Sequence, residues 1–92
     1  MDWEDISFVT GSKIRFKILL ELRKSNKTPS GLAASTKNPI SHVSLALNEL
    51  SKRELIKCLT PNVRKNKFYQ ITDKGNKILD DINKETGRNK RF

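Results

Sequence analysis

The chain has 92 residues, of which 35% are hydrophobic and 32% are charged, so it has the size of one small domain with one core. No apolar run reaches the roughly 18 residues that a membrane-spanning helix needs, and the acidic start MDWEDISF is unlike a signal peptide. A single Cys and a single His exclude a disulfide framework and a Cys-based zinc site.

The basic side chains are concentrated in the second half of the chain. Residues 1–51 carry 7 basic and 5 acidic side chains, a net charge of +2, whereas residues 52–92 carry 12 basic and 5 acidic ones, a net charge of +7. An excess of this kind favours a polyanionic partner such as nucleic acid. Solubility alone is the alternative explanation of the charge.

The chain begins with a lead-in segment, residues 1–11, which we expect to form a short helix or an irregular stretch. Over residues 12–24, apolar side chains then recur at four-residue spacing, at Ile14, Ile18 and Leu22. This spacing predicts a helix with one buried stripe. Ser12 is suited to be its N-cap, because a serine side chain accepts a hydrogen bond from the first helical turn.

Two further helices are indicated by proline signals. The pair Thr28-Pro29 predicts a short helix through Ser35, with threonine as cap and proline in the first helical position. The pair Asn38-Pro39 repeats the signal and predicts a longer helix over residues 40–53. One face of this longer helix is apolar on a helical wheel and is expected to be buried: Ile40, Val43, Ala46, Leu47 and Leu50.

After these helices the period changes to that of β-structure. Residues 55–60 and 67–72 read as two strands joined by the basic loop 61–66, which predicts a hairpin. A last helix is expected over residues 73–84, followed by a basic tail, residues 85–92, that we expect to be disordered. The predicted fold is therefore mainly α with a small β-hairpin (an α+β domain), and two helices joined by a tight turn before a hairpin indicate a winged helix-turn-helix.

Three stretches carry a resemblance to a known family: IRFKILLELRK, TPSGLAASTKNPISHVSLALNELSKRELI and LTPNVRKNKFYQITDKGNKIL. Over residues 12–84 the chain resembles archaeal and bacterial winged helix-turn-helix transcription regulators of the ArsR-like and MarR-like kind. The resemblance implies a sequence-specific regulator that binds double-stranded DNA. It also implies that residues 40–53 are the recognition helix, which lies in the major groove.

The resemblance assigns base or phosphate contacts to the outer face of that helix, at Ser41, His42, Ser44, Leu45 and Asn48. An asparagine such as Asn48 can pair with adenine through two hydrogen bonds. Leu45 departs from the polar residue that such regulators often carry at this point. An exposed leucine there can contact thymine methyl groups or pack against a partner.

The basic hairpin, residues 61–67, corresponds to the wing, which in these regulators touches the phosphate backbone or the minor groove. The wing residues expected to do so are Asn62, Arg64, Lys65, Asn66 and Lys67. Further phosphate contacts are expected from Thr28, Ser30 and Lys37. Contacts of this sort set affinity and register but carry little sequence information.

A regulator of this size is expected to act as a homodimer on two half-sites. We expect its interface at Trp3, Phe8, Val9 and Ile82. Two other functions stay open at this point. Leu45 and the acidic N-terminus favour a winged helix that docks on other proteins, and the charge alone fits a non-specific nucleic-acid-binding protein.

Catalysis is not indicated. The sequence has no glycine-rich phosphate loop, no paired His-carboxylate motif and no metal-ligand spacing. We therefore expect no enzymatic activity, no cofactor, no bound metal and no membrane partner, and we expect the protein in the cytoplasm.

Overall fold

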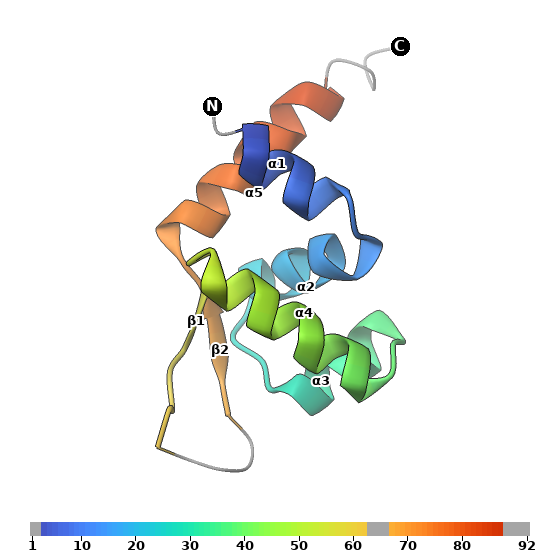
Figure 1. The fold of residues 1–92 in the computed structure, drawn as a ribbon, viewed down its shortest axis with the longest axis vertical. Helices are drawn as coiled ribbons and strands as arrows, with labels where there is room; N and C mark the ends of the chain where they lie inside the picture. The colour runs from blue at the N-terminus through green and yellow to red at the C-terminus, as the bar shows by residue number, and fades with distance from the viewer. Residues whose placement is uncertain (1–2, 63–66, 88–92) are drawn as a thin grey trace.

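The computed structural model describes residues 3–62 and 67–87 (Figure 1). Its elements are five helices and two strands: α1 (Trp3–Thr10), α2 (Lys13–Lys24), α3 (Pro29–Thr36), α4 (Ile40–Lys52), β1 (Ile56–Cys58), β2 (Tyr69–Ile71) and α5 (Asp73–Gly87). Figure 1 shows α1 beside α5 at one end of the molecule and the hairpin toward the other, with α2 and α4 between them and α3 at the level of the hairpin. This is the predicted fold class. No helix within the described residues is long and apolar enough to cross a membrane.

The helices α2 and α3 form where the sequence predicts them, and α1 forms in the lead-in segment, for which the sequence left a short helix open. The lead-in segment contains α1, which buries Ile6 and Val9. The Ser12 side chain accepts a hydrogen bond from the backbone N–H of Arg15 and caps α2. The Thr28 side chain does the same for α3 by accepting from Gly31 at 3.1 Å, with Pro29 in the first turn.

The start of α4 differs from its prediction at two residues. Its N-cap is Pro39, which makes no side-chain cap hydrogen bond. Asn38 instead donates its side-chain N–H to the Thr36 carbonyl at 3.0 Å and so closes the turn after α3. Ile40, predicted to be buried, is 51% exposed, because the first turn of α4 extends beyond the core, whose first member on this helix is Val43.

One hydrophobic core joins all five helices and the hairpin. The inner stripe of α4 lies at its centre, packed on α2 and α3: Val43, Ala46, Leu47 and Leu50. Each of these side chains is at most 2% exposed. Burial of this kind stabilises a small domain by about 25 cal/mol for each Å² of apolar surface removed from water, so this stripe fixes how α4 is rotated about its own axis.

The hairpin strands pair antiparallel, with Ile56 opposite Ile71 and Cys58 opposite Tyr69. They are shorter than the predicted strands, although the backbone N–H of Leu59 still donates to Phe68 beyond their ends at 2.8 Å. A third segment also joins the sheet and was not predicted. The backbones of Lys27 and Tyr69 exchange two hydrogen bonds of 2.9 and 3.3 Å, so β2 is held between β1 and the residues that precede α3.

A single residue, Thr72, connects the hairpin to α5. The Thr72 hydroxyl donates to the Glu54 carbonyl at 2.7 Å and accepts from Gly75 at 3.1 Å, which caps α5. A Cβ atom on Gly75 would lie 2.3 Å from the Leu55 carbonyl oxygen, so the close approach requires glycine. The helix continues to Gly87 and not to Lys84 as predicted, since no helix-breaking residue precedes that glycine. The rest of the predicted tail, residues 88–92, lies outside the described residues.

A charged cluster fastens α1 to the end of α4 and the start of α5. The Asp5 side chain is buried and accepts a hydrogen bond from Arg53 at 2.9 Å, and Lys74 lies 3.4 Å away. The guanidinium groups of Arg53 and Arg15 lie over the Phe8 ring, 4.2 and 4.0 Å from its centre, where the ring attracts cations. Sequence patterns did not single out Asp5 or Arg53, because the two residues are 48 positions apart.

The core stripe of α4 yields a first prediction. Leu47→Ala is expected to lower the free energy of unfolding by about 2–5 kcal/mol, because it leaves a cavity in the core. Leu45→Ala removes the same atoms from the exposed face of the same helix and should change it by less than about 0.5 kcal/mol. Urea unfolding followed by circular dichroism measures both. Equal losses for the two variants would contradict the described rotation of α4.

The charged cluster around Asp5 yields a second prediction. Arg53→Ala is expected to cost about 2–3 kcal/mol of stability, because it removes the cation that donates a hydrogen bond to the buried carboxylate of Asp5. Arg23→Ala is the matched control, since it breaks an exposed ion pair with Asp80 and should cost less than about 1 kcal/mol. Removing Asp5 as well should recover part of the Arg53→Ala loss. Similar losses for both arginines in thermal unfolding would rule out a structural role of the cluster.

Candidate nucleic-acid interface

The outward face of α4 holds the residues expected to read DNA. Because the opposite stripe is buried, the helix turns these side chains toward solvent, and all of them are exposed: Ser41, His42, Ser44, Leu45 and Asn48. Ser41, Leu45 and Asn48 follow one another along the middle of this face at helical spacing. Glu49 lies at its flank, where Arg15 binds its carboxylate at 3.2 Å, so this negative charge is balanced within the chain.

The wing is described only in part. Asn62 is exposed and Lys67 is half-buried, whereas Arg64, Lys65 and Asn66 lie outside the described residues. Burial raises the pKa of the Tyr69 hydroxyl above its ordinary value, so the base of the hairpin adds no negative charge at neutral pH. Just beyond the ends of β1 and β2, toward the tip of the hairpin, Leu59 is hydrogen-bonded to Phe68 through the backbone, and both apolar side chains are exposed.

The three residues expected to make further phosphate contacts do not lie together. Thr28 and Ser30 lie at the N-terminal end of α3, where free backbone N–H groups and the helix dipole favour anions. Lys37 follows the other end of this 8-residue helix, about 12 Å away along its axis. It adopts a left-handed backbone conformation with φ of 57°.

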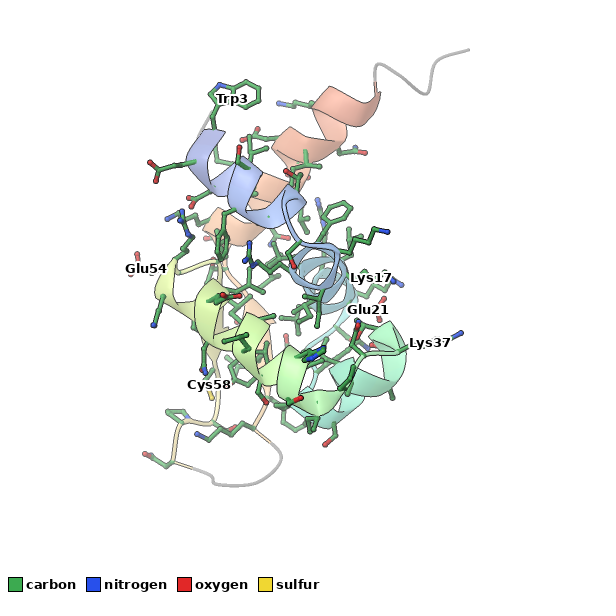
Figure 2. The ribbon with its side chains drawn as sticks, turned by 45° about the vertical axis from the view of Figure 1, so that its right-hand side comes forward. Trp3, Lys17, Glu21, Lys37, Glu54 and Cys58 are labelled. Carbon is green, nitrogen blue, oxygen red and sulfur yellow. The ribbon has the colours of Figure 1, made fainter. Side chains whose placement is uncertain are left out.

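Lys37 instead borders a groove of about 620 Å³ between α3 and the outer face of α2, together with Lys17 and Leu20. Figure 2 shows the Lys37 side chain extending away from the helices there. Within this groove Lys24 donates a hydrogen bond to Glu21 at 3.0 Å and lowers the pKa of that carboxyl group. No residue of α4 or of the described part of the hairpin lines the groove.

The residues expected at a dimer interface differ in what they offer to a partner. Trp3 is 57% exposed and lies at the outer end of α1 (Figure 2). Phe8 is half-buried beneath the two arginines. Val9 and Ile82 are buried in the core of the chain itself, since α1 packs on α2 and α5. Their side chains therefore present almost no surface to a second copy.

The cations of the chain fall into two groups that the sequence does not distinguish. Arg15 and Arg53 are bound to Glu49 and Asp5 and to the Phe8 ring. Lys52, on the outward face of the last turn of α4, and Lys67 are bound in no ion pair among the described residues. The part of the chain that the structure describes contains no cluster of three metal-binding side chains.

The arrangement is similar to that of several solved regulators. The transcriptional regulator BldR from Sulfolobus solfataricus matches 94% of this chain and 66% of its own, with a TM-score of 0.75 and 23% identity. A cysteine-to-serine mutant of MarR from E. coli matches 85% of this chain and 59% of its own, with a TM-score of 0.76 and 20% identity. The adhesin competence repressor AdcR from Streptococcus pyogenes matches the same shares, 85% and 59%, with a TM-score of 0.72 and 15% identity.

These likenesses confirm the predicted winged helix-turn-helix fold, which the chain shares with MarR. The chain spans less than two thirds of the length of each of these three structures. No curated protein sequence matches it. The model of one family, described as the N-terminal domain of the methanogenesis regulatory protein FilR1, matches residues 3–83. The chain therefore belongs to this family of regulatory N-terminal domains.

Proposed function

We propose that the chain is a sequence-specific transcription regulator that binds double-stranded DNA, with α4 in the major groove and the hairpin on the phosphate backbone. The observation that carries the proposal is the outward face of α4, which is anchored from behind by its core stripe. It carries exposed hydrogen-bonding side chains at Ser41, Ser44 and Asn48. The major groove, about 12 Å wide, admits a helix of this kind.

The elements around α4 support the same orientation. The N-terminal end of α3, with Ser30 exposed in its first turn, suits a phosphate group beside the groove. The hairpin carries Asn62 and Lys67, with Arg64, Lys65 and Asn66 between them in the sequence. Lysine and arginine there would neutralise phosphates and release counterions, which makes binding strong at low salt and weaker at high salt.

We further propose that the protein acts as a homodimer. A single small module buries limited surface on DNA, and two copies on two half-sites multiply affinity and select the spacing. Among the residues expected at the interface, the exposed ring of Trp3 supports a contact through the outer end of α1. This role needs no catalytic group, cofactor or metal, and a chromosomal partner would place the protein in the cytoplasm.

Docking on another protein is the second candidate function. The exposed side chain of Leu45, on an otherwise polar face, favours it, because apolar groups are enriched in the buried centres of protein interfaces. The two functions differ in salt dependence, since an apolar contact between proteins does not release DNA counterions.

Selection from a random pool of labelled duplexes at two salt concentrations tests the proposal. A sequence-specific dimer is expected to enrich a palindromic motif. Salt-sensitive binding without enrichment would leave a non-specific nucleic-acid-binding protein. An absence of binding at low salt would overturn the proposal in favour of protein docking.

The wing yields a quantitative prediction on the selected duplex. Arg64→Ala with Lys65→Ala should weaken binding about tenfold or more at physiological salt, and should do so on all sequences, because phosphate contacts carry no sequence information. The slope of log affinity against log salt should fall by about 2. Lys77→Ala with Lys84→Ala removes the same charge from α5 and should leave the slope nearly unchanged. Equal slopes for the two double variants would show that the wing makes no phosphate contact.

A further inference from the structure

Two large apolar side chains lie exposed on the helix proposed to enter the major groove. Leu45 is 60% exposed and Ile40 is 51% exposed. Neither belongs to the core, which takes Val43, Ala46, Leu47 and Leu50 from the same helix. Leu45 lies in the middle of the outward face, with Ser41 one turn before it and Asn48 almost one turn after it. The outward face of α4 therefore has one apolar side chain, Leu45, at its centre, with polar side chains on both sides of it.

The same surface lacks the arginine and lysine side chains that make the commonest contact to guanine. The usual guanine contact is a bidentate hydrogen bond from arginine or lysine to the O6 and N7 atoms. Residues 40–51 contain neither. The first cation of the helix is Lys52, in its last turn, and the next, Arg53, is bound to Asp5 and stacked on Phe8.

Thymine is the base that such a surface fits. Its 5-methyl group is the one apolar group that a base pair presents in the major groove, and aliphatic side chains contact it there. Ile40 lies about 140° from Leu45 around the helix, since each residue turns it by about 100°, so Leu45 is the large apolar side chain in the middle of the outward face. Leu45 can therefore contact a thymine methyl group, while the Asn48 amide has the donor and acceptor that adenine requires.

We propose that α4 recognises its half-site through a thymine methyl group, which Leu45 contacts, together with an adenine paired to Asn48. This inference rests on the proposed function, since it assumes that α4 enters the major groove. It assigns the DNA a class: half-sites whose centre is rich in A·T pairs, with no arginine or lysine contact to guanine from residues 40–51. Affinity from the wing is independent of this readout, because the wing contacts phosphates.

Deoxyuridine provides the test, because it keeps every hydrogen bond of thymidine and lacks only the methyl group. On the duplex selected from the random pool, thymines of the half-site are replaced by deoxyuridine one position at a time. The wild-type chain is expected to bind about fourfold more weakly for each contacted methyl group removed, the loss that corresponds to one buried CH₂-sized group. Replacements outside the half-site should have no effect.

A variant cycle assigns the contact to its side chain. Leu45→Ala should weaken binding to the thymine duplex and should lose sensitivity to deoxyuridine at the position that Leu45 contacts, because the two changes remove the same contact. Lys77→Ala, a change on α5 away from the outward face of α4, should keep the full sensitivity of the wild-type chain. The unfolding measurement on Leu45→Ala establishes that this variant is folded.

The outcomes separate this inference from the proposed function. Two outcomes would overturn the methyl readout and leave the proposed regulator function intact. One is sequence-specific binding that deoxyuridine does not change, and the other is a selected half-site centred on G·C pairs. Equal deoxyuridine sensitivity in the wild-type chain and in Leu45→Ala would overturn the role of Leu45. Failure to bind any duplex at low salt would overturn the proposed function itself.

Discussion

Burial of one stripe of α4 on α2 and α3 determines both the fold and the surface that the helix presents. Leu47 and Leu50 are held in the core, and successive residues of a helix are rotated by about 100°. Leu45 and Asn48 therefore face solvent, because the residues between them on α4 are held in the core. A rotation of the helix by one residue would place polar side chains in the core, at a cost of several kcal/mol for each unpaired group. The outward face is thus as well defined as the packing behind it.

The ionic contacts extend this constraint to the ends of the helix. Arg53 joins the end of α4 to Asp5 on α1, and Lys74 at the start of α5 lies beside the same carboxylate. Arg15 ties α4 to α2 through Glu49. These cations are bound within the chain, so the count of 19 lysine and arginine side chains overstates the number available to a polyanion. Among the described residues, the cations that remain for such a partner include Lys52 and Lys67.

Local signals in the sequence were sufficient for most of the fold. Apolar spacing and capping residues such as Ser12 and Thr28 predicted the helices, because periodicity and caps act within one or two turns. The features that were missed depend on contacts between distant segments. The backbone bridge from Lys27 to Tyr69 leaves no side-chain pattern, and the burial of Asp5 depends on its distant partner arginine. Of the candidate site, the outer face of α4 was predictable because it lies opposite the apolar stripe, whereas the groove that Lys37 borders leaves no pattern in the sequence.

In the proposed complex, affinity and sequence preference arise from different chemistry on different elements. A phosphate contact from the hairpin carries charge but no base identity, so it changes with salt and not with sequence. A methyl contact from Leu45 carries base identity but no charge, so it changes with sequence and hardly with salt. A helix without arginine or lysine over residues 40–51 contributes little non-specific attraction of its own. Such a helix can discriminate between sequences only after the basic hairpin has brought it to the DNA, which explains why one small domain carries both surfaces.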